Sequence, residues 1–360
     1  MTQTKPYRIG LIGLGDMAGA HINGIKNHAP HLKITAICDV REAALAKTGD
    51  QLGIPPERRF SDFRRLIADE EVDAVLSVTP NVVHAEIMAL CLATGKPFVS
   101  EKPFTMTLEE ADALLRVYEG RPVPAMIGFS YRYTPAFRFV RQLLKDGRIG
   151  GVRHFSVQYL QEWGSAAYDT PFLWRFDKNV TGTGTLGDLG AHMIDLAHYL
   201  IGSFEELSAH LQTIVAERRS LQSGETIPVE VDDLACFNAV MKNGAVGVFQ
   251  TTRNAIGSGN QLDIAIYGDS GTLRASTEDP EHVVWIHRDA ETGGRIEKRL
   301  DVPHAVKLSQ WEDFARLLDG SPSDGLPGFM AGYESQQVLD AILRAHEEKR
   351  TVAVAEEGSK

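Results

Sequence analysis

A glycine-rich turn directly after the first apolar run constrains the fold of this chain more than any other feature. The run Tyr7–Ile12 is typical of a strand, and Gly13–Ala18 (GLGDMA) follows it and opens a helical stretch. In that position Gly13 permits a tight turn, and Gly15 lets the backbone approach a pyrophosphate that the helix N-terminus attracts. The turn therefore predicts a dinucleotide site. Its expected contacts are Gly13, Gly15, Asp16, Met17 and Ala18.

The end of the second strand-like run indicates which dinucleotide to expect. Asp39 follows Ile34–Cys38, at the place where an acidic residue that binds the ribose is expected. A carboxylate there accepts a hydrogen bond from the 2′-hydroxyl of NAD and repels the 2′-phosphate of NADP. Arg41 lies close behind and could bind such a phosphate. We therefore expect NAD as the cofactor, and NADP stays open.

The order of the predicted elements indicates two domains of different character. Up to Gly128, short β-rich runs alternate with amphipathic helical stretches, which predicts parallel strands with right-handed crossovers and a Rossmann domain over residues 1–128. Beyond it, β-rich runs joined by hairpin signals such as 242–244 and 268–271 predict a large, mostly antiparallel open sheet. The expected fold is therefore α/β, with a C-terminal α+β domain over 129–360. Its last helices can pack back on the Rossmann domain.

Composition excludes several function classes. The formal charge of 37 − 48 = −11 repels a polyanion, so we expect no nucleic-acid partner. No run approaches the roughly 18 apolar residues of a membrane span, and no secretory signal is visible, so a cytoplasmic enzyme is expected. The three cysteines, Cys38, Cys91 and Cys236, stand in apolar contexts and are expected to be reduced core thiols.

Two segments carry residues suited to proton and hydride chemistry. Lys102 comes just after a predicted strand, at the carboxyl edge of the parallel sheet, where its ammonium group could stabilise a developing alkoxide. Asp188 and His192 are spaced i, i+4 on a helix predicted over 186–200, and the imidazole could accept a hydroxyl proton. A metal site with His198 is not expected, because about 600° of helical rotation separates it from His192. We predict no metal.

Aromatic residues precede that helix. Trp163, Trp174 and Arg175 combine aromatic faces with polar groups, which suits a sugar or cyclitol, although the same residues could equally be core aromatics. The glycine-rich stretch 181–187 lacks the lysine and the preceding strand of a phosphate loop. We interpret it as a close-packed loop that lines the substrate pocket.

Three segments in this order resemble the glucose–fructose oxidoreductase/inositol dehydrogenase (Gfo/Idh/MocA) family. They are Thr79–His84 (TPNVVH), Glu101–Pro103 (EKP) and Gly187–His192 (GDLGAH), and the resemblance covers nearly the whole chain. It implies that Lys102, Asp188 and His192 form the catalytic trio, with the histidine as acid and base. It places Thr79, Asn81, His84 and Glu101 at the cofactor, and it implies that Tyr131, Arg132, Trp163, Trp174 and Arg175 border the substrate. It also suggests a cis Lys102–Pro103 bond, and it implies a homodimer or homotetramer that assembles through the open face of the second sheet.

The expected function is an NAD-dependent dehydrogenase that oxidises a hydroxyl of a sugar, sugar derivative or cyclitol. Two alternatives stay open. One is a glycosidase that oxidises and re-reduces its sugar, with no net NADH. The other is a regulator that senses NAD or a sugar without catalysis, although such a protein has no need of Lys102 beside a proton acceptor.

Overall fold

The computed structural model describes residues 6–354, which divide into two compact units. One unit runs to Gly128 and also contains Leu308–Tyr333; the other contains Phe129–Lys307 and the chain from Glu334 onward. Residues 308–333 thus belong to the same unit as the chain up to Gly128. Each unit encloses buried apolar side chains of its own.

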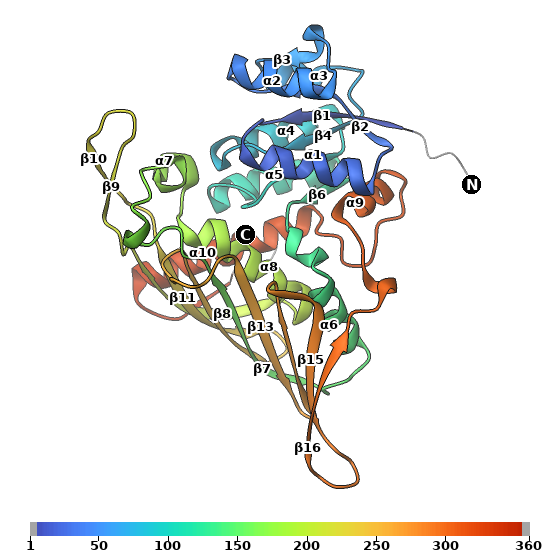
Figure 1. Ribbon diagram of the computed structural model, residues 1–360, viewed down its shortest axis with the longest axis vertical. Helices are drawn as coiled ribbons and strands as arrows, with labels where there is room; N and C mark the ends of the chain where they lie inside the picture. The colour runs from blue at the N-terminus through green and yellow to red at the C-terminus, as the bar shows by residue number, and fades with distance from the viewer. Residues whose placement is uncertain (1–5, 355–360) are drawn as a thin grey trace. The chain divides into compact units, whose positions relative to one another are not determined.

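The first unit is built on a parallel six-stranded sheet with the order β3-β2-β1-β4-β5-β6 (Figure 1). Its strands are β1 (Tyr7–Ile12), β2 (Leu32–Cys38), β3 (Arg59–Phe60), β4 (Ala74–Ser77), β5 (Phe98–Ser100) and β6 (Ala125–Ile127). The central strand β4 is buried along its whole length, as expected for a parallel strand with both faces covered. Strand order reverses between β1 and β4, and ligands bind at such a point beyond the carboxyl ends of the strands.

Helices cover this sheet, and some of them begin at a capping side chain. They are α1 (Asp16–His28), α2 (Glu42–Leu52), α3 (Phe63–Ala68), α4 (His84–Thr94), α5 (Leu108–Gly120) and α9 (Gln310–Leu318), with short turns η1 (Pro56–Arg58) and η2 (Asn81–Val83). The Thr107 side chain caps α5, and Ser309 with Glu312 forms a capping box at α9. Helix α9 packs on α1 through Trp311, whose ring meets that of His21 edge-on at 5.4 Å.

The second unit contains a nine-stranded sheet with the order β16-β15-β14-β13-β7-β12-β11-β8-β17. All its neighbouring pairs are antiparallel except β7 with β12. The strands are β7 (Val152–Leu160), β8 (Phe204–Gln212), β11 (Leu234–Met241), β12 (Val246–Thr252), β13 (Gln261–Gly268), β14 (Gly271–Ser276), β15 (Asp279–Arg288), β16 (Arg295–Asp301) and β17 (Val352–Ala353). A separate hairpin pairs β9 (Glu217–Arg219) with β10 (Thr226–Pro228). The predicted fold class is confirmed in both units.

Helices cover one face of this sheet. They are α6 (Pro135–Lys145), α8 (Ala191–Leu200) and α10 (Phe329–Glu348), and smaller turns are η3 (Ser130–Tyr133), η4 (Ala166–Tyr168), η5 (Trp174–Phe176), α7 (Lys178–Thr181) and η7 (His304–Val306). Along β7 the side chains of Phe155, Val157 and Tyr159 are buried beneath this layer. On β12 the alternate side chains Val246 and Val248 point away from it and are 44% and 52% exposed. The sheet is therefore open on its other face.

The helix predicted over 186–200 has an irregular start. Residues Leu186–Gly190 form a π-helical turn, η6, and regular α-helix begins only at Ala191. Such turns widen a helix and often mark functional positions. The turn carries Asp188, and His192 lies on the first α-helical turn after it.

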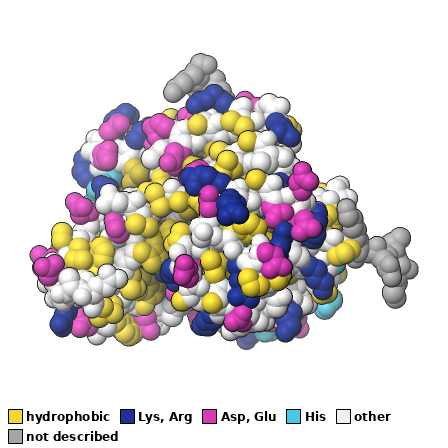
Figure 2. Space-filling model, turned by 90° about the horizontal axis from the view of Figure 1, so that it is seen from above, with side chains coloured by type: hydrophobic (Ala, Val, Ile, Leu, Met, Phe, Trp, Pro, Cys, Tyr) yellow, Lys and Arg dark blue, Asp and Glu magenta, His cyan; other side chains and the backbone are white. Residues whose placement is uncertain are grey.

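Among residues 6–354, no helix is both long and apolar enough to cross a bilayer. Figure 2 shows that acidic and basic side chains are interspersed on the face seen from above. On that face neither sign forms one continuous field.

Candidate active site

The turn between β1 and α1 has the backbone that a dinucleotide requires. Gly13 adopts a φ of +90°, and a Cβ atom there would lie 2.3 Å from the Val78 carbonyl oxygen, so only glycine fits. At Gly15, by contrast, no described atom lies within 4 Å of the Cβ position. The backbone is therefore open to a ligand at Gly15. Helix α1 begins at the next residue, with its first N–H groups near this opening.

Asp39 sits at the end of β2, where the sequence placed it. Its Oδ2 accepts the Leu14 N–H at 2.8 Å, and Arg41 donates to both carboxylate oxygens from its backbone N–H and its guanidinium. Burial would raise the pKa of Asp39, but the hydrogen bonds from Arg41 and Leu14 lower it. The carboxylate is therefore ionised at neutral pH. The Arg41 side chain is 60% exposed, so solvent can replace its contact with Asp39 when a ribose hydroxyl binds the carboxylate.

A pocket of about 510 Å³ opens beside this pair. The glycine turn and helices α1 and α2 line it, and its residues include Gly15, Asp16, Ala18, Arg41 and Lys47. The open Gly15 backbone, the helix N-terminus and the ionised Asp39 together fit NAD. They would hold the pyrophosphate and the adenosine ribose.

His84 lies behind this site. It is completely buried, and its Nδ1 and Nε2 lie 2.8 Å and 2.9 Å from the carbonyl oxygens of Pro103 and Thr79. Burial lowers the pKa of His84, against the raising effect of these two carbonyls. The histidine therefore braces the two segments from inside. The Thr79 hydroxyl contacts that of Ser77 at 3.0 Å.

Glu101 and Lys102 follow β5 at the carboxyl edge of the sheet. Oε1 of Glu101 lies 3.0 Å from Nε2 of His21 on α1, a partner that the sequence did not indicate. A Cβ atom at Gly128, just after β6, would lie 2.9 Å from Glu101 Oε1, so glycine there leaves room for this carboxylate. The Lys102–Pro103 bond is cis, as the resemblance suggested.

In the second unit, the π-turn presents Asp188 to two arginines. Arg253 Nη2 donates to Asp188 Oδ2 at 2.8 Å, and Arg175 Nε lies 3.9 Å from the same oxygen. His192 follows, with its ring at the edges of Tyr131 at 4.7 Å and Phe129 at 6.4 Å. The structure therefore brings the predicted pair together on one irregular helix start. Within residues 6–354, no group of three or more His, Cys, Asp or Glu side chains is arranged to hold a metal.

A hydrogen-bonded wall of hydroxyl and amide groups begins at Tyr131 and Tyr159, whose rings lie 4.7 Å and 6.2 Å from that of His192. Tyr131 and Tyr159 share a hydrogen bond of 2.6 Å, and Asn260 contacts both phenols at 2.9 Å and 2.7 Å. Gln161 donates to Asn260 at 2.7 Å and accepts from the Trp163 indole at 2.6 Å. Burial raises the pKa of Tyr159, so its phenol stays protonated at neutral pH.

Sequence reasoning missed three members of this wall, Tyr159, Gln161 and Asn260. A signal for the first two exists in the sequence, since Tyr159, Gln161 and Trp163 alternate along the end of a strand and so share one face. No local pattern indicates Asn260, which lies just before β13. Only strand pairing brings it beside β7.

The predicted aromatic and arginine residues differ in their contacts. Trp163 packs on Phe176 and also hydrogen-bonds the wall, whereas Arg175 stacks on the half-exposed Trp174 at 4.5 Å. Arg132 is different, because it is buried. Its guanidinium pairs with Asp195 on α8, with Nη2 2.6 Å from Oδ1 and Nε 2.8 Å from Oδ2. This ion pair links η3 to α8.

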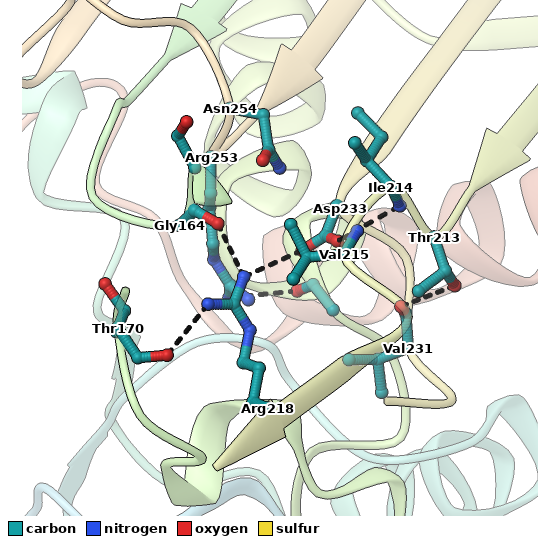
Figure 3. Close-up of polar contacts among 12 residues, drawn as sticks. Gly164, Thr170, Thr213, Ile214, Val215, Arg218, Val231, Asp233, Arg253 and Asn254 are labelled. Atoms are coloured by element: carbon teal, nitrogen blue, oxygen red, sulfur yellow. Dashed lines mark hydrogen bonds and ion pairs between the residues drawn. The ribbon is translucent and has the colours of Figure 1, made fainter. Parts of the chain in front are cut away.

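A second buried arginine lies beside Arg253. Arg218, on the β9–β10 hairpin, donates to the carbonyl oxygens of Gly164 and Thr170 at 2.5 Å and 3.0 Å and lies 4.0 Å from Asp233 (Figure 3). It thereby ties the hairpin to the segment that carries Trp163 and Arg175. Sequence reasoning did not single out Arg218 or Arg253, because neither stands in a recognisable motif.

Comparisons with known proteins cover both units. Residues 7–129 match a family model described as an oxidoreductase family with an NAD-binding Rossmann fold, and residues 137–274 match that of the GFO/IDH/MocA C-terminal domain. A levoglucosan dehydrogenase of Pseudarthrobacter phenanthrenivorans is 36% identical, with 94% of this chain and 95% of the relative covered. A myo-inositol 2-dehydrogenase of Thermotoga maritima is 27% identical over 97% of this chain and 99% of its own.

Solved structures agree with this likeness. A levoglucosan dehydrogenase in complex with NADH and L-sorbose superposes with a TM-score of 0.89 at 28% identity, covering 97% of this chain and 99% of that one. The complex with NADH and levoglucosan gives 0.88 at 29% identity, covering 97% and 100%.

Proposed function

The chain belongs to the Gfo/Idh/MocA family of oxidoreductases, and from that premise we propose that it oxidises a ring hydroxyl of a sugar, sugar derivative or cyclitol with NAD. The observation that supports the proposal is the π-turn with Asp188, followed by His192, whose ring lies 4.7 Å from that of Tyr131 in the hydrogen-bonded wall. Several hydroxyl and amide donors around one titratable imidazole suit a polyhydroxylated ring. An anhydrosugar is the first substrate class to test, because a levoglucosan dehydrogenase is 36% identical to this chain.

In this proposal each residue has a defined task. Bound NAD supplies the hydride acceptor. His192 accepts the proton of the hydroxyl that is oxidised, and Asp188 orients the substrate or the imidazole. Lys102 stabilises the negative charge that develops on the substrate oxygen, because an ammonium group is most effective where water is excluded.

The polar wall would select the ring. Tyr131, Gln161 and Asn260 present donors and acceptors that can exchange their mutual hydrogen bonds for substrate hydroxyls. A site built this way rejects a deoxy analogue strongly, because the missing hydroxyl leaves a buried polar group without a partner.

The proposal is tested by NADH formation with levoglucosan, free monosaccharides, inositols and glycosides, each with NAD and with NADP. We expect turnover with one of these classes and NAD. Sugar released from a glycoside without net NADH would instead favour the redox-neutral glycosidase. Tight NADH binding with no reaction on any compound would favour a sensor.

The Lys102→Met variant tests the chemistry. We expect NADH affinity within about threefold of wild type and a loss of turnover of about 10²–10⁴-fold, the range for a group that acts on the reacting oxygen. The melting temperature checks that the variant folds. Undiminished turnover would remove Lys102 from the mechanism.

We also propose that the chain forms a homodimer or homotetramer through the open face of the nine-stranded sheet. The outward side chains near its centre, Val246 and Val248 on β12, are about half exposed and stand over several neighbouring strands. Neighbouring exposed valines on a sheet face form an apolar patch of the kind that a partner can cover.

A further inference from the structure

Arg253 leads the largest fully buried side chains of the described chain, with 1% of its surface exposed. It follows β12, and its Cζ lies 5.1 Å from the ring centroid of Trp163 and 5.8 Å from that of Phe176. From this aromatic surround its Nη2 reaches the Asp188 carboxylate at 2.8 Å and the Gly184 carbonyl oxygen at 3.3 Å. Arg253 is thus a buried side chain whose charged group contacts the π-turn from the interior of the protein.

A buried guanidinium requires a carboxylate, and the surroundings of Arg253 leave Asp188 in that role. Asp233 gives one oxygen to the N–H groups of Ile214 and Val215, while Arg218 approaches the other (Figure 3). Asp232 accepts two backbone N–H groups of the glycine-rich loop. Within residues 6–354, the Nε and Nη1 atoms of Arg253 find no acceptor. Asp188 is therefore the carboxylate that Arg253 hydrogen-bonds, while the nearby charge of Asp232 also interacts with the guanidinium.

The same contacts hold the loop that leads into the π-turn. Asp232 accepts the N–H groups of Gly184 and Leu186, each at 2.7 Å, and Arg253 donates to the carbonyl oxygen of Gly184. Asp232 and Arg253 are themselves joined through the paired ends of β11 and β12, since the Arg253 N–H donates to the carbonyl oxygen of Asp233. The sheet thus fixes both the backbone and the carboxylate of the turn.

Arg175, the other arginine near Asp188, is differently placed. It lies 3.9 Å from the carboxylate, its side chain is 27% exposed, and it stacks on the exposed ring of Trp174. Such a side chain is free to move with its loop. The packed Arg253 is not.

We propose that Arg253 is a positioning residue for the reaction. It holds the Asp188 carboxylate and the π-turn in a single orientation, and thereby sets the place of His192 on the following helical turn. This role rests on the proposed function, in which Asp188 and His192 act on the substrate hydroxyl. Arg253 itself transfers no proton.

The kinetic test compares Arg253→Met with Arg253→Lys. We expect Arg253→Met to lower kcat by about 10–100-fold with a smaller change in KM, because the loss concerns orientation during the reaction. Arg253→Lys keeps a charge that can reach Asp188 and should recover at least about tenfold of that loss. NADH affinity and the melting temperature of both variants report whether the units remain folded. Equal kcat values for the two variants would contradict the proposal.

A double-mutant cycle separates positioning from general support of the fold. If Arg253 acts through Asp188, Arg253→Met combined with Asp188→Asn should be no slower than Asp188→Asn alone, within about threefold. The matched control is Arg218→Met, which removes the neighbouring buried arginine that donates to the carbonyl oxygens of Gly164 and Thr170. Its effect on kcat should multiply with that of Asp188→Asn. Multiplicative effects in both cycles would assign Arg253 a structural role only.

Crystal structures of wild type and Arg253→Met decide the positioning without turnover. We expect the Asp188 carboxylate to leave its wild-type position in the variant, with the 184–188 backbone following. An Asp188 side chain that stays in place would overturn the proposal even in an active enzyme. If Asp188 moves in the variant but the wild type turns over no substrate, the positioning role stands and the proposed reaction is overturned.

Discussion

At the scale of single residues, we expect Asp39 and Arg41 to decide which cofactor is favoured. Asp39 is ionised and anchored by the Leu14 N–H, so it would repel a second negative charge at the ribose. Arg41 pairs with Asp39, and its side chain is 60% exposed and so accessible to a phosphate. We therefore expect a preference for NAD to depend on the carboxylate, and any capacity for NADP to depend on the guanidinium.

Substitution of these two residues should move the preference in opposite directions. Asp39→Asn keeps an acceptor for Leu14 but removes the charge, so the NADPH dissociation constant should fall relative to that of NADH by about tenfold or more, equivalent to about 1.4 kcal/mol. Arg41→Met should raise the NADPH constant and leave that of NADH within about threefold. Fluorescence titrations measure both without a substrate. No change in the ratio for Asp39→Asn would show that Asp39 does not discriminate.

His84 and Arg132 show what a motif leaves undecided about single residues. Both stand in or beside segments that resemble functional motifs, yet each is buried and holds partners of its own. A motif records which residue types are needed around a site but not whether a side chain faces the ligand or braces the backbone behind it. That distinction depends on packing.

At the scale of elements, the π-turn depends on a close approach of two backbones. A Cβ atom at Gly184 would lie 1.9 Å from the Asp232 carbonyl oxygen. This backbone oxygen cannot move away easily, because the chain there leads directly into strand β11. The loop therefore tolerates only glycine at this point.

Gly184→Ala should consequently destabilise the protein by about 1–3 kcal/mol and lower kcat, because the displaced turn carries Asp188. The matched control is Gly120→Ala, where no described atom lies within 4 Å of the Cβ position. Urea unfolding and steady-state kinetics measure both effects. Wild-type stability in Gly184→Ala would mean that the turn adapts.

Helix α8 carries a histidine whose burial makes stability depend on pH. Burial, aided by the charge of Arg132, lowers the pKa of His198 to about 3 from an ordinary value of 6.5. The unfolded chain binds a proton at His198 as the pH falls below 6.5, whereas the folded chain does not until about pH 3. This contribution to stability is thus fully present above pH 6.5 and is lost progressively as the pH falls toward 3.

Between pH 8 and pH 5, protonation of His198 in the unfolded chain should therefore lower the unfolding free energy of wild type by about 2 kcal/mol. The His198→Phe variant lacks this titration, so over the same pH interval its unfolding free energy should fall by about 2 kcal/mol less than that of wild type. Urea unfolding at several pH values gives both curves. Parallel curves would show that His198 is not the source of the pH dependence.

At the scale of the whole molecule, the open face of the nine-stranded sheet is the surface through which we propose that copies of the chain assemble. Val248 lies opposite Asn238 on β11 and Ser156 on β7, so it stands inside the face and not at its edge. Leu221, between β9 and β10, is more exposed at 79% but lies outside this sheet.

Val248→Glu should therefore dissociate the assembly toward the 39.6 kDa chain, because carboxylates from two copies would meet in an apolar interface. Leu221→Glu is the matched control and should leave the mass unchanged. Light scattering coupled to size-exclusion chromatography measures both. A wild type that is already monomeric, or a Val248→Glu variant of unchanged mass, would exclude this face as the interface.

The sequence by itself determined the architecture and the cofactor turn. Periodicity of two and of about 3.6 residues is local, so the strand–helix alternation, the switch to hairpins after Gly128 and the Gly13–Ala18 turn could all be predicted without coordinates. Asp188 and His192 followed for the same reason, since their spacing lies within one element.

Only the tertiary structure decided how that site is supported. Asn260 meets Tyr159 through strand pairing, and Arg253 meets Asp188 from 65 residues away. The return of residues 308–333 to the first unit likewise depends on contacts such as that of Trp311 with α1. These contacts join residues far apart in the chain, and no local periodicity specifies them. They arise because buried charges and aromatic rings must find partners once the sheets have closed around them.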